Sequence, residues 1–346
     1  MHFREEINLG FIYIGTLVGA GFASGQEIMK FFTVYGWYGL LGIFLACLFF
    51  FVLGYLIMSR AIGIGASSIK DILLPAAGEK LAAFFEITVD LLLLGGYYIM
   101  VSGCGAVLWE SMKIPYLPAT MAICMVCVLW LKNGVHGLAE FNRVIVPVMV
   151  ILTLFITFFS LKKPGDFGNI LNIPVQAGNT WFFSAVLYVS YNMASASVVL
   201  ASLGTYTGRV KAAFGAALIA SAEFFIMASA LWVLTTVYFS ELEGVEIPLM
   251  VIARGAGPVF YWASVAVLLS AMLTTALSFG FASAMGISSR FGINYSCALL
   301  SLFAGLPFTG YGFSRLIGVV YPLFGVAGIF FGFLLVARRF LSLKRE

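Results

Sequence analysis

Long apolar runs place the strongest limit on the fold of this chain. A helix needs about twenty apolar residues to cross the hydrocarbon core of a bilayer, and the chain divides into about ten such runs with short connectors. Hydrophobic residues make up 62% of the sequence and charged residues only 10%, so almost nothing is left for a soluble domain. The runs cover roughly residues 8–34, 37–59, 80–110, 115–131, 137–161, 179–203, 210–239, 256–288, 292–306 and 312–337.

The predicted fold class is all-α. None of the runs shows the alternating pattern of about ten residues that is typical of a transmembrane β-barrel strand. Inside lipid only helices and closed barrels satisfy every backbone hydrogen-bonding group, so a helical bundle is the remaining architecture. We therefore expect one transmembrane domain over residues 1–346, with the lipid bilayer as its surroundings.

The distribution of basic residues predicts the orientation. With ten spans both ends of the chain lie on one side, and thirteen of the nineteen Lys and Arg residues are assigned to that side. Basic residues are enriched in cytoplasmic loops, so we expect a cell-membrane protein with both termini in the cytoplasm. The net charge of +4 reflects this topology, and nothing in the sequence supports nucleic-acid binding. The thirteen residues are Arg4, Arg60, Lys70, Lys80, Lys132, Arg143, Arg209, Lys211, Arg290, Arg338, Arg339, Lys344 and Arg345.

Two halves of the chain, about residues 8–162 and 179–340, share the same irregularities. In each half the first span contains small and polar residues, and the third span is unusually long. A connector suited to a short surface helix, residues 61–79 or 240–255, separates the second and third spans. Each half has an odd number of spans, so the halves lie inverted in the membrane, as in many secondary transporters. The sequence thus predicts a 5+5 inverted repeat with discontinuous first and sixth helices.

The first span contains GTLVGAGFASGQE, residues 15–27, in which four glycines interrupt the apolar run. Glycine destabilises a helix interior by about 1 kcal/mol relative to alanine, so we predict unwinding here and around residues 189–197 of the sixth span. Carbonyls and amides freed at membrane depth must line a cavity or bind a ligand. Close helix packing is the alternative, because residues 15–19 and 21–25 both match the small-xxx-small pattern.

A small solute is expected to bind between the two predicted breaks. The amides of Ala23, Ser24 and Gly25 would face its anionic group, since the N-terminus of a half-helix presents a positive dipole end. The expected solute-binding residues are Gly19, Ala20, Gly21, Phe22, Ala23, Ser24, Gly25, Tyr97, Ser190, Tyr191, Asn192 and Ser195.

The stretch Val18-Gly19-Ala20-Gly21 in an N-terminal span resembles the first-helix signature of the LeuT-fold transporters, the amino acid–polyamine–organocation superfamily. GAGFASGQEI, together with YVSYNM in the sixth span, is similar to the uncharacterised bacterial YkvI-type membrane proteins. The resemblance covers nearly the whole chain. It implies the ten-helix core of that fold, without the two extra C-terminal helices of some relatives.

The resemblance also implies a sodium site. In sodium-coupled members an ion lies between first-helix carbonyls and paired hydroxyls of the eighth helix. The matching groups here are the carbonyls of Gly15 and Val18 and the hydroxyls of Thr274 and Thr275, with Ser278 one turn on. The alternative is that these hydroxyls bond their own helix backbone. Some proton-coupled relatives place a fifth-helix lysine at this point, and the fifth span here has none, which favours sodium as the coupling ion with no other cofactor.

Four carboxylates fall within the spans, namely Glu27, Glu86, Asp90 and Glu223. A charge near the bilayer centre is costly, so each should be paired, protonated or exposed to water, and we expect roles in coupling or gating. Glu86 and Asp90 share a helix face, where they carry protons or form a strut to Asn142 or Arg143. Glu27 either pairs with Lys30 or belongs to an outer gate, and Glu223 has no evident partner.

These features predict a secondary transporter that moves a small organic solute, such as an amino acid or similar zwitterion, by sodium-driven alternating access. A proton-coupled transporter of the same fold and a ligand-sensing receptor subunit without transport are the alternatives. An intramembrane enzyme is not expected, because that chemistry needs a cluster of acidic, histidine or nucleophilic residues. Of the two histidines, one is at the N-terminus and the other in a loop. The sequence does not identify protein partners.

Overall fold

The computed structural model describes residues 2–161, 180–242, 245 and 247–311. Within these ranges the chain is helical and forms no β-strand, which confirms the all-α class. The predicted tenth span, residues 312–337, and the junction between the predicted halves lie outside the described residues.

Among the residues that the structure describes, six helices are long and apolar enough to cross a membrane, and each coincides with a predicted span. They are α4 (Trp37–Ile64), the Ala77–Met112 part of α5 (Ile69–Met112), α7 (Gly134–Ser160), α8 (Thr180–Ser202), α9 (Ala212–Val237) and α11 (Pro258–Phe291). A shorter apolar helix, α6 (Tyr116–Leu131), occupies the predicted fourth span. The chain is therefore a multi-pass membrane protein.

One face of α4 shows why the surroundings must be lipid. Large apolar side chains recur on it at helical spacing and stay exposed, while the opposite face is buried against the bundle. Such a stripe facing away from the core suits hydrocarbon and not water. The exposed residues are Leu41, Phe44, Leu48, Val52 and Leu56.

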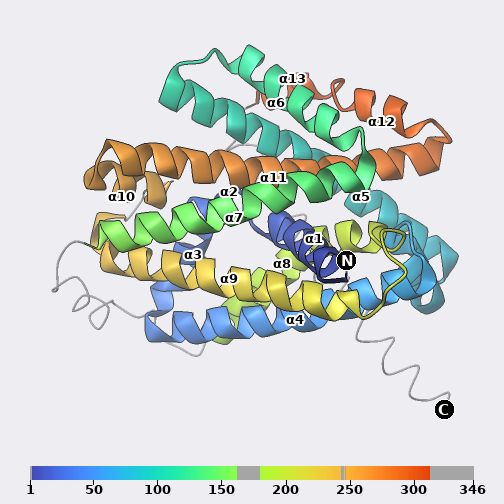
Figure 1. Cartoon of the computed structure of the whole chain (residues 1–346), viewed down its shortest axis with the longest axis horizontal. Helices are drawn as coiled ribbons and strands as arrows, with labels where there is room; N and C mark the ends of the chain where they lie inside the picture. Colours follow the sequence, from blue (N-terminus) through green and yellow to red (C-terminus); the bar gives the residue numbers. More distant parts are fainter. Residues whose placement is uncertain (1, 162–179, 243–244, 246, 312–346) are drawn as a thin grey trace.

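The helices run alongside one another in layers (Figure 1). In this view α6 lies on one side of α11, α9 and α4 lie on the other, and α5 crosses α11. The helix α1 (His2–Leu17) lies in the middle, where it packs against α7, α9 and α11. The helix α8 packs against α4 and α1. The first span of each predicted half is thus placed inside the bundle.

The first span is broken, as predicted. Helix α1 ends at Leu17, one turn of helix forms α2 (Ala20–Ala23), and α3 (Gln26–Phe31) follows. Gly19 between α1 and α2 is extended, with φ −92° and ψ −171°. Gly25 between α2 and α3 has φ +82°, in the left-handed region that glycine enters without a steric penalty.

The sixth span is not broken, so the predicted discontinuity at residues 189–197 is wrong. Helix α8 is continuous from Thr180 to Ser202. This segment contains no glycine, and its polar side chains bond the carbonyls of their own helix. The hydroxyl of Ser190 donates to Val186 O at 2.8 Å, and the amide of Asn192 donates to Tyr188 O at 3.0 Å. Self-satisfied side chains of this kind leave the helix ladder intact.

The predicted ninth span, residues 292–306, is also divided. It forms α12 (Tyr295–Ser301) and α13 (Leu306–Thr309) with a turn between them. Tyr98 of α5 fills this turn, because its hydroxyl donates to Leu302 O at 3.1 Å. A side chain at Gly305 would overlap the Tyr98 ring, so an inserted aromatic side chain accounts for the break.

The packing partners correspond between the two predicted halves. Helix α1 packs on α9 as α8 packs on α4, and α1 packs on α11 as α8 packs on α5. The long third helices are α5 and α11. A short helical segment precedes the long part of each. In α5 it is the segment before the bend at Gly78, which has φ +72°, and before α11 it is the short helix α10 (Pro248–Ala256). A 5+5 inverted repeat accounts for this pattern, and the assignment of the halves stays a prediction.

Candidate functional site

A small cavity lies beside the break between α1 and α2. Its volume is about 30 Å³, which is room for one or two water molecules or an ion. The cavity is therefore too small for an organic solute, which requires it to widen. It is lined by Thr16, Leu17, Gly19, Glu27, Met100, Tyr191, Asn192, Ser195, Thr275 and Phe279.

The structure brings part of the expected solute site to this cavity. Gly19, Tyr191, Asn192 and Ser195 line it. The other expected residues are not among its lining residues, and several have structural contacts of their own. The hydroxyl of Tyr97, for example, donates to Cys124 Sγ at 3.2 Å. The residues outside the lining are Ala20, Gly21, Phe22, Ala23, Ser24, Gly25, Tyr97 and Ser190.

The amides expected to hold an anionic group are already bonded, so this prediction is wrong. The N–H groups of Ala23, Ser24 and Gly25 donate to the carbonyls of Gly19, Ala20 and Phe22 at 3.0, 2.9 and 2.9 Å. The reason is that residues 20–23 form a helical turn in place of extended chain. The Ser24 carbonyl accepts from the Leu249 N–H of α10 at 2.9 Å, so α10 covers the turn between α2 and α3.

Oxygen atoms from α1 and α11 meet next to the cavity. In an unbroken helix the Gly15 carbonyl would accept from the Gly19 N–H, but that group donates to Leu17 O at 3.2 Å. The hydroxyl oxygen of Thr275 lies 3.1 Å from Gly15 O and 3.0 Å from Val18 O. Three of the oxygens expected at the sodium site are thus brought together by helices far apart in the sequence.

The neighbouring hydroxyls behave differently. Thr274 donates to Ala271 O of its own helix at 3.0 Å, as the alternative for these residues predicted. Ser278 is fully buried, and its hydroxyl has no hydrogen-bond partner within the described ranges. Ser278 is three residues after Thr275 and therefore lies on the same face of α11.

Asn142 of α7 is a site residue that the sequence analysis assigned elsewhere. Its Nδ2 group donates to Leu138 O at 3.0 Å. Its Oδ1 atom is buried and has no hydrogen-bond partner among the residues that the structure describes. A methyl group at Gly15 would overlap this Oδ1 atom and come within 3.3 Å of Thr274 Cβ. A further acceptor oxygen therefore lies beside the Gly15 backbone. In the sequence, this residue was marked only as an asparagine within an apolar span.

The donor set suits an alkali cation. It consists of two carbonyl oxygens, one hydroxyl and a neighbouring amide oxygen, which are the hard ligands that such cations prefer. The described residues contain no group of three or more His, Cys, Asp or Glu side chains that could hold a transition metal. To bind a cation, the Thr275 O–H must turn away from the two carbonyls so that its lone pairs face the ion.

Two bacterial proteins are similar to this chain over nearly its whole length. The uncharacterized protein YyaD of Bacillus subtilis (strain 168) is 28% identical over 341 residues, which covers 95% of this chain and 96% of YyaD. The uncharacterized membrane protein YkvI of the same organism is 26% identical over 332 residues, 93% of each chain. No protein-family profile matches the chain.

Solved transporter structures share the arrangement of the helices. MhsT in complex with L-phenylalanine aligns with a TM-score of 0.66 at 16% identity, over 92% of this chain and 87% of MhsT. Mhp1, a nucleobase-cation-symport-1 family transporter, aligns with a TM-score of 0.67 at 15% identity, over 93% and 74%. This chain has the LeuT fold. A Na⁺-coupled sialic acid symporter also shares it, with a TM-score of 0.66 at 12% identity over 95% and 74%.

The LeuT fold confirms the resemblance drawn from the glycine motif, and the similarity to YkvI confirms the resemblance drawn from GAGFASGQEI and YVSYNM. In this chain the interruption is confined to the first helix within the described ranges of the two lead spans.

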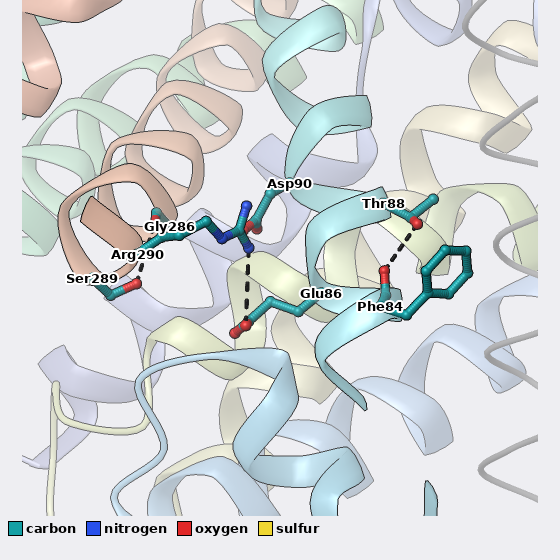
Figure 2. A network of polar contacts seen from close by, with 7 residues as sticks. All are labelled: Phe84, Glu86, Thr88, Asp90, Gly286, Ser289 and Arg290. Carbon is teal, nitrogen blue, oxygen red and sulfur yellow. Dashed lines mark hydrogen bonds and ion pairs between the residues drawn. The ribbon is translucent and has the colours of Figure 1, made fainter. Parts of the chain in front are cut away.

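An ion-paired cluster links the two long helices of this LeuT-fold protein. The guanidinium group of Arg290, on α11, lies 2.9 Å from Asp90 Oδ2 and 4.0 Å from Glu86 Oε2, both on α5 (Figure 2). The predicted strut to Asn142 or Arg143 is therefore wrong, because the partner of both carboxylates is Arg290 of α11. A side chain at Gly286 would overlap the Asp90 carboxylate, so glycine there lets the helices approach.

Arg290→Met is expected to lower the free energy of unfolding by about 1–3 kcal/mol, because it leaves two carboxylates facing each other without a cation. The effect is below that of a fully buried pair since Arg290 is 31% exposed. Thermal unfolding in detergent measures it. Arg143→Met is the matched control, as Arg143 forms no ion pair within the described residues. An equal loss in both variants would contradict the assignment.

The remaining carboxylates lie apart from this cluster. Glu223 of α9 does not line the cavity, and its Oε2 atom is buried without a hydrogen-bond partner in the described part of the chain. Glu27 does not pair with Lys30, since none of the ion pairs between described residues includes it. Glu27 lines the cavity, while Lys30 is exposed.

Proposed function

We propose that this protein is a secondary transporter that moves a small organic solute across the cell membrane by alternating access, coupled to sodium. The observation that carries the proposal is the contact of the Thr275 hydroxyl with the carbonyls of Gly15 and Val18 at the break in the first span. These are the groups that the LeuT-fold resemblance assigns to a sodium ion, and they come from two helices that are 257 to 260 residues apart.

A cation bound by these three oxygens would couple ion binding to solute binding through the two helices. It would attract the α1 carbonyls and the α11 hydroxyl together, so it favours conformations in which the two helices are close. Thr275 belongs to both the oxygen cluster and the cavity wall, and Gly19 of the wall directly follows Val18 of the cluster. Because coupling between two ligands is reciprocal, a cation that closes this wall also strengthens solute binding.

Contacts of the N-terminal part of α1 support the proposed orientation in the membrane. The N-terminal part of α1 is tied to the connector between α8 and α9. The Asn8 amide donates to the Tyr206 hydroxyl at 2.8 Å, and Arg209 lies 3.5 Å from Glu5. These contacts support a position of the N-terminal part of α1 on the same side as that connector, and the distribution of basic residues predicts that this side is the cytoplasm.

The proposal is tested by uptake into liposomes. Solutes are first screened by thermal shift with and without sodium, since a ligand stabilises the folded protein by mass action. We expect a solute whose uptake under an inward sodium gradient exceeds that under a potassium gradient by at least about tenfold. Empty liposomes are the control. Uptake without sodium dependence at any pH would contradict the coupling, and saturable binding without counterflow would favour a receptor.

A further inference from the structure

The Glu27 side chain is the only charged group among the residues that line the cavity. It begins in the first turn of α3 and reaches back across the break to the wall formed with Gly19 and Met100. Its sequence neighbour of opposite charge, Lys30, is exposed and makes no ion pair with it. The carboxylate therefore enters the cavity without a cation of its own within the described residues.

The backbone is shaped to seat this carboxylate. A methyl group at Gly21 would overlap the Glu27 carboxyl group, so any larger residue at Gly21 would push Glu27 out of place. The left-handed glycine at Gly25 starts α3 and sets the direction in which Glu27 leaves the backbone. Two glycines of the motif thus serve to position one acidic side chain.

The groups around Glu27 are suited to orient its carboxyl group and to contact an apolar ligand body. The hydroxyls of Tyr188 and Tyr191 on α8 are hydrogen-bond partners of the Glu27 side chain, and donors of this kind stabilise a carboxylate. Met100 and Phe279 provide apolar wall on the facing helices. A buried carboxylate without a cation is costly, so a positively charged ligand would relieve that cost.

The cavity offers nothing comparable to an anion. None of its lining residues is Lys, Arg or His. The amides of Ala23, Ser24 and Gly25 are bonded to backbone carbonyls. A free carboxylate on the solute would therefore meet Glu27 with no basic side chain in the lining to offset the repulsion, which costs affinity.

We propose that Glu27 binds the ammonium group of a positively charged organic solute, so that amines are preferred over zwitterions and anions. The inference rests on the proposed function, because it names the solute class of the same cavity. Glu27 is not among the groups of the ion site at Gly15, Val18 and Thr275, so sodium binding there is expected to persist without Glu27.

Binding to the purified protein tests the proposal. The probes are the alkylamines from ethylamine to hexylamine, with the alcohols, carboxylates and α-amino acids of matching chain length, each assayed by thermal shift in sodium chloride. We expect amines to raise the unfolding temperature most. In Glu27→Gln their apparent affinity should fall about 10- to 100-fold, as expected for loss of a charge-assisted hydrogen bond. Glu110→Gln, an exposed carboxylate on α5, is the matched control and should bind amines like the unaltered protein.

Two further measurements keep the result interpretable. The shift caused by sodium alone should be retained in Glu27→Gln, which shows that this variant folds with its ion site intact. If Glu27→Gln does not fold, Glu27→Asp retracts the carboxylate by one methylene and should move the preference towards longer amines. Amine binding that survives in Glu27→Gln, or a panel in which no amine stabilises the protein, would overturn the proposal. Sodium-driven uptake of an anion would overturn the amine proposal and leave the transporter proposal standing. Amine binding without uptake would support the amine proposal and contradict the transporter proposal.

Discussion

Thr275→Val is expected to remove most of the sodium dependence of binding and uptake. The substitution keeps the shape of the side chain but deletes the hydroxyl that lies 3.1 Å from Gly15 O and 3.0 Å from Val18 O. A hydrogen bond or ligand contact to a charged species contributes about 1.5–3 kcal/mol, so the apparent affinity for sodium should fall about 10- to 100-fold. Sodium-induced thermal shift of the purified protein measures this directly.

Thr274→Val is the matched control for this experiment. Thr274 is the adjacent residue on α11 and is equally buried, but its hydroxyl donates to Ala271 O of its own helix. Loss of such a bond leaves the helix ladder intact, and the sodium affinity should change by less than about threefold. A larger effect in Thr274→Val than in Thr275→Val would place the cation elsewhere and contradict the proposed site.

Gly15→Ala is expected to have the second large effect. A methyl group at this position would overlap Asn142 Oδ1 and press against Thr274, so the Asn142 side chain and α11 would have to shift. Overpacking of this kind costs about 1–3 kcal/mol of unfolding free energy. It should also displace the Gly15 carbonyl and weaken sodium binding. Thermal unfolding in detergent and the sodium-induced shift report the two effects.

Gly19→Ala provides the comparison within the same motif. A methyl group there would lie 3.9 Å from both Met100 Cε and Thr275 Oγ1, and the φ of −92° is accessible to alanine. The unfolding temperature should therefore be nearly unchanged. If Gly19→Ala were as destabilising as Gly15→Ala, the small-xxx-small packing alternative would explain both glycines better than an ion site does.

Gly15 and Gly19 show that the packing prediction and the unwinding prediction apply to different glycines of the motif. The packing pattern holds at Gly15, where α7 and α11 come close. The unwinding prediction holds at Gly19 and Gly25, whose backbones leave the helix. The sequence presented the same residue type at each place, and only the neighbours on other helices distinguish their roles.

The sequence by itself determined the properties that depend on local composition. Hydropathy over about twenty residues located the spans, because the thickness of the bilayer is fixed. Clustered glycines located the break in the first span, because they lower helix stability wherever they occur. Polar residues without glycine did not break α8, since their side chains bond the carbonyls of the preceding turn.

Only the tertiary structure decided which side chains meet. That Arg290 faces Asp90 across 200 residues, that Thr275 and not Thr274 reaches the α1 carbonyls, and that Glu27 turns into the cavity away from Lys30 all depend on helix rotation and tilt. Rotation and tilt are set by how the surfaces of neighbouring helices interlock. That information is spread over contacts between distant segments, so no local window of the sequence contains it.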